Sequence, residues 1–147
     1  MKREILFRGK RSDNGEWVKG YLIGNNVIVG EVVDFDEDYF TTEFWYKVDP
    51  ETVGQFTGLT DKNGAKVFEG DVVSFSSWKH GSHSYNPDFV FVYEIRFTRL
   101  SWYCCGDGFS VKLHQEMQDT PLNNDGCIAR IIEVIGNIYD NHELIKP

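Results

Sequence analysis

Apolar and polar residues alternate with a period of two along much of the chain, which is the pattern of half-buried β-strands. From Phe89 to Thr98 every odd position is apolar, and from Tyr39 to Val48 the even positions Phe40, Phe44 and Val48 share one face. The same reasoning predicts further strands at residues 4–10, 16–23, 26–33, 67–75, 102–105, 109–113 and 128–135.

Residues that accept a positive φ separate these runs at the spacing that short hairpin loops require. They occur at 13–15, 24–26, 61–64, 106–108 and 125–126. Helical signals are few. Asp49 followed by Pro50 predicts a capped helical turn at 49–52, and Asp140 or Asn141 is placed to cap another short turn through Leu144. The main building unit is therefore the β-hairpin.

These patterns predict a mostly β protein with few short helical turns. We expect one domain over residues 1–147, with possible subdomains at 1–66, made of β-hairpins, and at 67–147, a small SH3-like or β-barrel-type unit. The run Val67–Val73 contains a Gly-Asp pair before two valines and resembles the opening strand of small SH3-like barrels. Four glycines at 54, 58, 64 and 70 predict a tightly wound connector rather than regular strands. The polar stretch 76–88 is expected to be a loop.

The composition is typical of a globular protein that folds without disulfides or structural metal ions. The chain has 147 residues, 41% of them hydrophobic, and a formal net charge of −8. A chain of this length can build a core without metals or disulfides. Cys104, Cys105 and Cys127 are odd in number and two are adjacent, so we expect reduced thiols. With no apolar run of membrane-spanning length and no signal-peptide pattern, we expect a cytoplasmic protein without a membrane partner.

Three sequence blocks together resemble the YopX family of bacteriophage and prophage proteins. They are residues 5–10 with 15–20, residues 49–64 with 68–73, and residues 133–141. The resemblance runs over essentially the whole chain, with a variable middle from about 74 to 126. It implies a small, mostly β protein encoded in phage or prophage genomes and acting in the cytoplasm of a bacterial host. It implies no enzymatic reaction, so it supplies no catalytic residue.

Charge is distributed unevenly along the chain. Residues 1–22 hold six basic and three acidic residues, a balance of +3. Residues 31–51 hold eight acidic residues against Lys47 alone, a balance of −7. Opposed patches of this kind can pair within a subunit or set the register between subunits. We therefore expect a homo-oligomer or a complex with a host or phage protein.

Metal and catalytic motifs are incomplete. The acidic run 34–38 fails as a calcium loop because Tyr39 stands where that loop needs glycine and Trp45 where it needs glutamate. Zinc would need His80, His83, Cys104 and Cys105, which lack the usual ligand spacing. The stretch 81–85 lacks the last glycine of a nucleophile elbow. We expect no enzyme activity, no catalytic residue, no metal and no cofactor, although the 76–88 loop and the acidic run stay open as binding segments.

Nucleic-acid binding is the second hypothesis. Aromatic residues of a small β-barrel can stack bases, yet phosphate neutralisation dominates affinity and the chain is acidic. Only the first segment could contact phosphates, through Lys2, Arg3, Arg8, Lys10 and Arg11. A third hypothesis is an acidic decoy that occupies a host DNA-binding enzyme. The first hypothesis, a non-enzymatic module for protein–protein contacts, is the one we favour.

Overall fold

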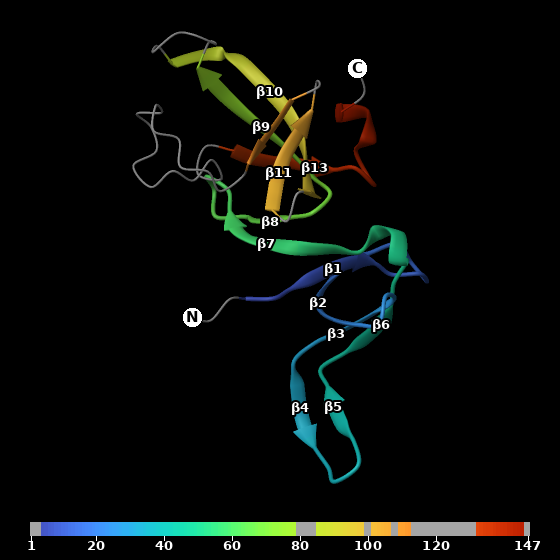
Figure 1. Cartoon of the computed structure of the whole chain (residues 1–147). Coiled ribbons are helices and arrows are strands. Elements are labelled where there is room, and N and C mark those ends of the chain that lie inside the picture. The colour runs from blue at the N-terminus through green and yellow to red at the C-terminus, as the bar shows by residue number, and fades with distance from the viewer. Residues whose placement is uncertain (1–3, 79–84, 99–100, 107–108, 113–131, 146–147) are drawn as a thin grey trace. The chain divides into compact units, whose positions relative to one another are not determined.

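The computed structural model describes residues 4–78, 85–98, 101–106, 109–112 and 132–145 (Figure 1). The chain divides into two compact units, Met1–Gly58 and Leu59–Pro147. The sequence prediction is one domain over residues 1–147, with possible subdomains at 1–66 and 67–147. Within the described residues no helix is long and apolar enough to cross a membrane.

Unit 1 is an antiparallel sheet of short strands, in the hydrogen-bonded order β6-β3-β2-β1-β7. β7 contains residues of both units, and β8 (Lys66–Phe68) belongs to unit 2. Register pairs Phe7 with Gly20 and Tyr21 with Val29. The bounds are β1 Phe7–Lys10, β2 Trp17–Ile23, β3 Val27–Val29, β6 Trp45–Lys47 and β7 Gly54–Thr60.

The core of unit 1 forms where backbones approach closely. Ile28 and Val48 are fully buried. A Cβ on Gly20 would lie 2.2 Å from the carbonyl oxygen of Val29, and one on Gly9 would lie 3.1 Å from Val48. Glycine at position 20 is therefore what lets β2 and β3 pair at this distance.

The capped turn predicted at 49–52 is confirmed as the 3-10 helix η1, Pro50–Thr52. The Asp49 carboxylate accepts a hydrogen bond from the Glu51 N–H at 3.0 Å. Thr52 Oγ1 accepts from the Lys10 N–H at 2.9 Å and donates to the Asp49 carbonyl at 2.7 Å. Residues from the first and second sequence blocks thus meet at the end of β1.

A separate two-stranded hairpin, β4 (Val32–Phe35) and β5 (Phe40–Thr42), extends away from the sheet of unit 1 (Figure 1). Two backbone bonds close its base, from the Gly30 N–H to Phe44 and from the Glu43 N–H to Glu31. The single strand predicted for 39–48 is therefore wrong, because β5 pairs with β4 whereas β6 pairs with β3. The alternating pattern correctly predicts that Val48 is buried, but Phe40, near the other end of the same pattern, is exposed.

Unit 2 contains a five-stranded antiparallel sheet in the order β12-β11-β10-β9-β13. Tyr93 and Ile95 of β10 lie in its core with Val72, Val73 and Ile132. The predicted strand at 89–98 is confirmed, although Phe97 at its end is exposed. The bounds are β9 Asp71–Trp78, β10 Tyr85–Thr98, β11 Ser101–Gly106, β12 Phe109–Lys112, β13 Ile132–Asn137 and the 3-10 helix η3 His142–Ile145.

A buried carboxylate ties the second and third sequence blocks together. Asp61 Oδ1 accepts from the N–H groups of Asn63 and Ala65, and its Oδ2 accepts from the N–H of Val134, each at 2.9 Å. The Lys62 N–H donates to the Ile132 carbonyl at 3.0 Å. We call this arrangement the Asp61 corner; its residues are Asp61, Lys62, Asn63, Ala65, Ile132, Glu133 and Val134.

The Gly-Asp pair of the second block has a similar structural role. Gly70 has a φ of +88° and donates its N–H to Ile95, while its carbonyl accepts from Ile138. The Asp71 carboxylate, which is 1% exposed, accepts from the Phe68 N–H at 2.7 Å. This turn separates β8 from β9, so the single strand predicted for 67–75 is divided in two.

The predicted fold class is confirmed as mostly β with antiparallel sheets and short helical turns. In the described ranges the strands do not close into a barrel. Two further local predictions are wrong. Residues 54–60, expected to wind tightly, form β7, and the ends of the expected 76–88 loop belong to β9 and β10. The loop prediction otherwise falls on residues 79–84, outside the described part.

Candidate protein-docking surface

The β4–β5 hairpin exposes all of residues 31–41 to solvent. Phe35 and Phe40 face each other across the two strands, with ring centroids 6.5 Å apart, and are 76% and 53% exposed. Tyr39 beside them is 65% exposed. An aromatic pair of this size normally helps to fill a core or an interface. Here it lies on the surface of the chain.

The acidic run of the hairpin has only local backbone partners. Asp34 accepts a hydrogen bond from the Phe35 N–H at 2.9 Å, and Asp36 accepts from the Glu37 N–H at 2.6 Å. Among the described residues, none of the carboxylates at 34, 36, 37 and 38 forms an ion pair. Their charge is therefore directed to solvent.

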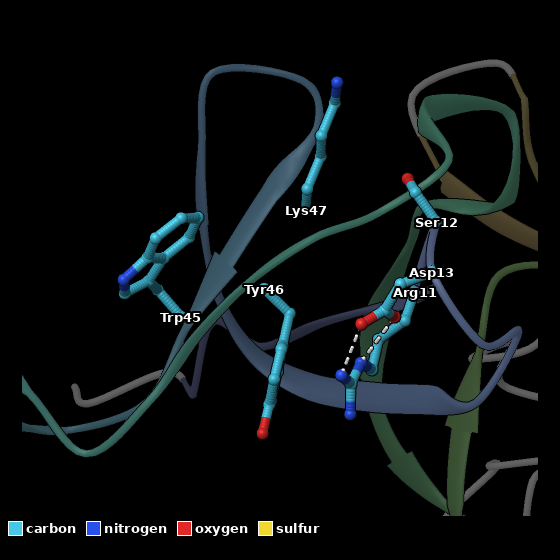
Figure 2. Close-up of a pocket in the computed structure, with 6 residues that line it drawn as sticks. All are labelled: Arg11, Ser12, Asp13, Trp45, Tyr46 and Lys47. Atoms are coloured by element: carbon cyan, nitrogen blue, oxygen red, sulfur yellow. Dashed lines mark hydrogen bonds and ion pairs between the residues drawn. The ribbon is translucent and has the colours of Figure 1, made fainter.

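A pocket of about 430 Å³ lies in unit 1 where the turn after β1 meets β6 (Figure 2). The Ser12 N–H donates to the Lys47 carbonyl at 2.9 Å, which holds the two segments together. Figure 2 shows its lining residues: Arg11, Ser12, Asp13, Trp45, Tyr46 and Lys47.

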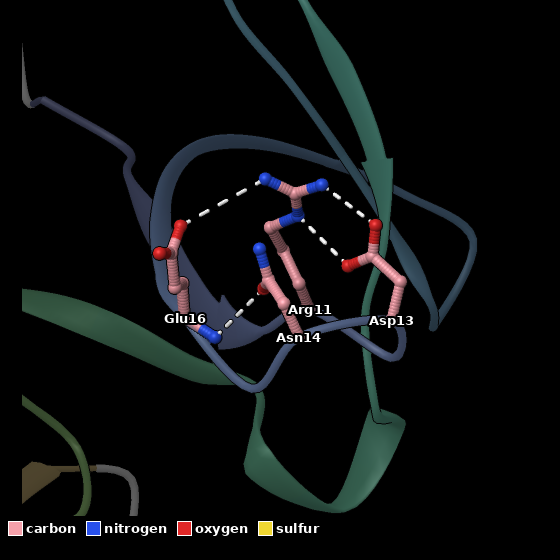
Figure 3. A network of polar contacts seen from close by, with 4 residues as sticks. All are labelled: Arg11, Asp13, Asn14 and Glu16. Atoms are coloured by element: carbon pink, nitrogen blue, oxygen red, sulfur yellow. Dashed lines mark hydrogen bonds and ion pairs between the residues drawn. The ribbon is translucent and has the colours of Figure 1, made fainter.

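The guanidinium of Arg11 is engaged within unit 1 (Figure 3). Its Nε and Nη2 donate hydrogen bonds to the two carboxylate oxygens of Asp13, at 2.9 and 2.6 Å. Its Nη1 lies 3.9 Å from Oε2 of Glu16. The guanidinium carbon Cζ lies 3.9 Å from the centroid of the Tyr46 ring. The bond to Asp13 raises the pKa of Arg11, and the same bond lowers the pKa of Asp13. Stacking and the paired carboxylate hold this cation in place.

The structure describes three of the five residues of the nucleic-acid hypothesis, and each of the three lies over an aromatic ring. Arg8 is 8% exposed, and its guanidinium carbon lies 4.8 Å from the Trp17 ring centroid. Lys10 Nζ lies 5.6 Å from the same centroid. Arg11 is paired with Asp13, as above, and Lys2 and Arg3 lie outside the described residues. The interaction with aromatic faces accounts for where Arg8 and Lys10 point.

Most residues of the metal and catalytic hypotheses fall outside the part of the chain that the structure describes. His80, His83 and Cys127 fall outside the described residues, and Cys104 and Cys105 belong to β11. The part of the chain that the structure describes contains no cluster of three or more His, Cys, Asp or Glu arranged to hold an ion.

The pKa of Asp61 is lowered by the hydrogen bonds that hold its carboxylate in the Asp61 corner. Burial would raise the pKa of Asp61, but hydrogen bonds from the N–H groups of Val134, Ala65 and Asn63, with the charge of Lys62, outweigh it and lower the pKa. A carboxylate held by three backbone donors is stabilised in its charged form. It is thus suited to anchoring loops rather than to proton transfer.

Sequence reasoning missed two features of this surface. It placed Phe40 on a buried face, and it gave Trp45 and Tyr46 no role beyond their strand. The available signal was composition, because the uninterrupted acids at 34–38 make burial of the neighbouring aromatics costly. Gly30 was another signal: a Cβ there would lie 2.8 Å from the Phe44 ring, which marks the point where the hairpin leaves the sheet.

Comparison with solved structures finds a similar chain titled "Crystal structure of protein EF1440 from Enterococcus faecalis". The two share 22% sequence identity with a TM-score of 0.53, over 99% of this chain and 100% of that one. At this identity the likeness concerns the fold. No curated protein matches significantly.

A family model described as "YopX protein" matches residues 6–146, nearly the whole chain. It spans all three of the blocks that carry the resemblance, except for Ile5 at the start of the first block. The chain belongs to the YopX family.

Proposed function

We propose that this protein is a non-enzymatic accessory of a phage or prophage, active in the bacterial cytoplasm, that works through protein–protein contacts made by the β4–β5 hairpin. The observation that carries the proposal is the exposed Phe35–Phe40 pair on a projecting two-stranded element. Its partner is either a second copy of the chain or another phage or host protein.

The hairpin has the properties of a surface that a partner covers. A two-stranded hairpin alone is at best marginally stable in water, and large exposed apolar patches mark interaction sites. Val32 and Val33 of β4 are 44% and 58% exposed, which extends the apolar surface along the strand. Docking would remove this surface from water at about 25 cal/mol per Å² of apolar area.

The assignment to a binding role rather than to catalysis is supported by the ionisable groups. The described carboxylate that is both buried and shifted in pKa, Asp61, has backbone partners for both oxygens. Arg11 and Asp13 neutralise each other at the rim of the pocket. These groups are committed to structure, whereas the hairpin side chains are not.

The experiment is cross-linking of the purified full-length chain, alone and in bacterial lysate. Phe35→Ser with Phe40→Ser removes the aromatic pair. Ile5→Ser with Ile23→Ser is the matched control, because those residues are 54% and 48% exposed outside the hairpin. We expect the wild type and the control to yield the same cross-linked products, and the hairpin variant to lose them. Products that are unchanged in the hairpin variant, or absent from the wild type, would overturn the proposal.

A further inference from the structure

The apolar face of the β4–β5 hairpin is surrounded by negative charge. Residues 31–43 contain six acidic residues and no basic residue. Phe35 pairs with Phe40 and Asp34 pairs with Thr41, so the aromatic pair and Asp34 occupy opposite faces of the two strands. The remaining acids of the run, Asp36, Glu37 and Asp38, form the loop between the strands.

The negative charge of the hairpin indicates which kind of molecule binds the Phe35–Phe40 face. Nucleic acid carries negative charge along its whole length and is repelled. A second copy has a net charge of −8, and three of its described cations, Arg11, Lys62 and Arg96, already pair with Asp13, Glu133 and Glu94. Nucleic acid carries no positive charge, and a second copy is acidic overall, so both are disfavoured beside the acidic hairpin. A cationic protein carries the complementary positive charge.

We infer that the Phe35–Phe40 face docks into an apolar recess that lysine and arginine side chains surround on a partner protein, the kind of surface with which proteins hold nucleic-acid phosphates. The inference rests on the proposed function and adds the chemistry of the partner. The two rings enter the recess and supply the affinity. The acids at 34, 36, 37 and 38 meet the surrounding cations, speed the encounter and exclude acidic partners.

The interaction depends on salt in a defined way. The carboxylates are exposed, so their attraction to a cationic surface is screened over about 8 Å at physiological ionic strength. Raising the salt concentration therefore slows association, whereas the contact of the two rings with the recess persists.

The test uses a fluorescein-labelled 16-residue peptide of arginine and leucine in equal number, titrated with the full-length chain and followed by anisotropy. A glutamate–leucine peptide of the same length and a random DNA duplex are the comparison probes. The hairpin variant combines Asp34→Asn, Asp36→Asn, Glu37→Gln and Asp38→Asn. The charge-matched control combines Glu4→Gln, Glu16→Gln, Glu51→Gln and Glu143→Gln, which are all exposed outside the hairpin.

We expect the arginine–leucine peptide to bind the wild type and the control alike, within about twofold, and to bind the hairpin variant about tenfold more weakly. Equal weakening in both variants would show an effect of net charge alone and overturn the inference. Equal binding of the glutamate–leucine peptide or of the duplex would overturn it as well. Circular dichroism melts of each variant verify folding.

The inference and the proposed function fail in different ways. If Phe35→Ser with Phe40→Ser abolishes the cross-linked products but neutralising the four hairpin acids does not, the docking role stands and the cationic partner is wrong. If the product is a dimer of the chain itself and the hairpin is needed for it, the occupant is a second copy and the inference is overturned. If neither variant changes the products, both proposals fail.

Discussion

The Asp61 corner and the β4–β5 hairpin use acidic residues in opposite ways. Asp61 is 6% exposed and accepts three backbone hydrogen bonds, two within its own turn and one from β13. Each residue from 34 to 38 in the hairpin is exposed. The corner joins two of the sequence blocks that carry the family resemblance, whereas the hairpin lies between blocks. The recognisable residues at this corner therefore belong to the framework, and the surface proposed for docking is made of residues outside the three blocks.

The largest expected effect is a loss of stability when the Asp61 corner is altered, compared with a substitution in the β4–β5 hairpin. Asp61→Ala leaves three backbone N–H groups without their acceptor, and each such buried group costs about 1–3 kcal/mol. We expect the free energy of unfolding to fall by about 3 kcal/mol or more, measured by urea denaturation. Asp38→Ala at the hairpin tip is the control and should change it by less than about 0.5 kcal/mol. Similar losses in both variants would remove the distinction.

Substitutions at Gly70 and Gly15 test whether close packing against a neighbouring side chain adds to the cost of replacing a glycine that has positive φ. Both have positive φ, +88° and +72°. A Cβ at Gly70 would lie 3.1 Å from Tyr139 Cε2, whereas nothing lies within 4 Å of one at Gly15. Gly→Ala at either position incurs the left-handed penalty of about 1–2 kcal/mol. We expect Gly70→Ala to lower the melting temperature further than Gly15→Ala does; equal decreases would mean that Tyr139 gives way.

The lowered pKa of Asp61 predicts a dependence of stability on acid. Because its folded-state pKa lies below the unfolded value of about 3.9, its contribution is fully present above that pH and is lost as the pH falls through the folded-state pKa. Urea midpoints of the wild type and Asp61→Asn should differ near neutral pH and converge in acid. A gap that stays constant down to about pH 2 would show that the charge of Asp61 is not what stabilises the corner.

The smallest effect on stability belongs to the hairpin. Phe35→Ser with Phe40→Ser removes two exposed rings that pack on each other, and the change in the free energy of unfolding should stay within about 0.5 kcal/mol. The same variant should lose cross-linking to partners. A large loss of stability in urea denaturation would mean that the rings belong to the framework.

The sequence predicts the fold class well because period-two alternation and turn residues are local signals. It placed β10 and the Asp49 cap correctly for that reason. It failed at 39–48, where one alternating pattern spans β5 and β6, because the choice of partner strand is not encoded in the period. It also failed at 54–60: β1 pairs with Gly54 and Gln55, and this non-local pairing overrides the glycine signal.

The candidate site was harder to predict than the fold. Arg8 and Arg11 are basic residues in an acidic chain, which suggested a phosphate contact. Their positions over Trp17 and Tyr46 depend on strand register, which a charge count does not contain. The acidic run 34–38 was recognised, but the exposure of Phe40 follows from the departure of the hairpin at Gly30.

The closed base of the hairpin has an evolutionary consequence. β3 pairs with β6 on its own, through Val27–Lys47, Ile28–Tyr46 and Val29–Trp45, and the bonds at Gly30 and Glu43 end that ladder before β4 begins. Residues can therefore be inserted or deleted between 32 and 42 without shifting the register of the sheet below. Evolution can therefore exchange this short stretch of codons while the rest of the gene stays intact.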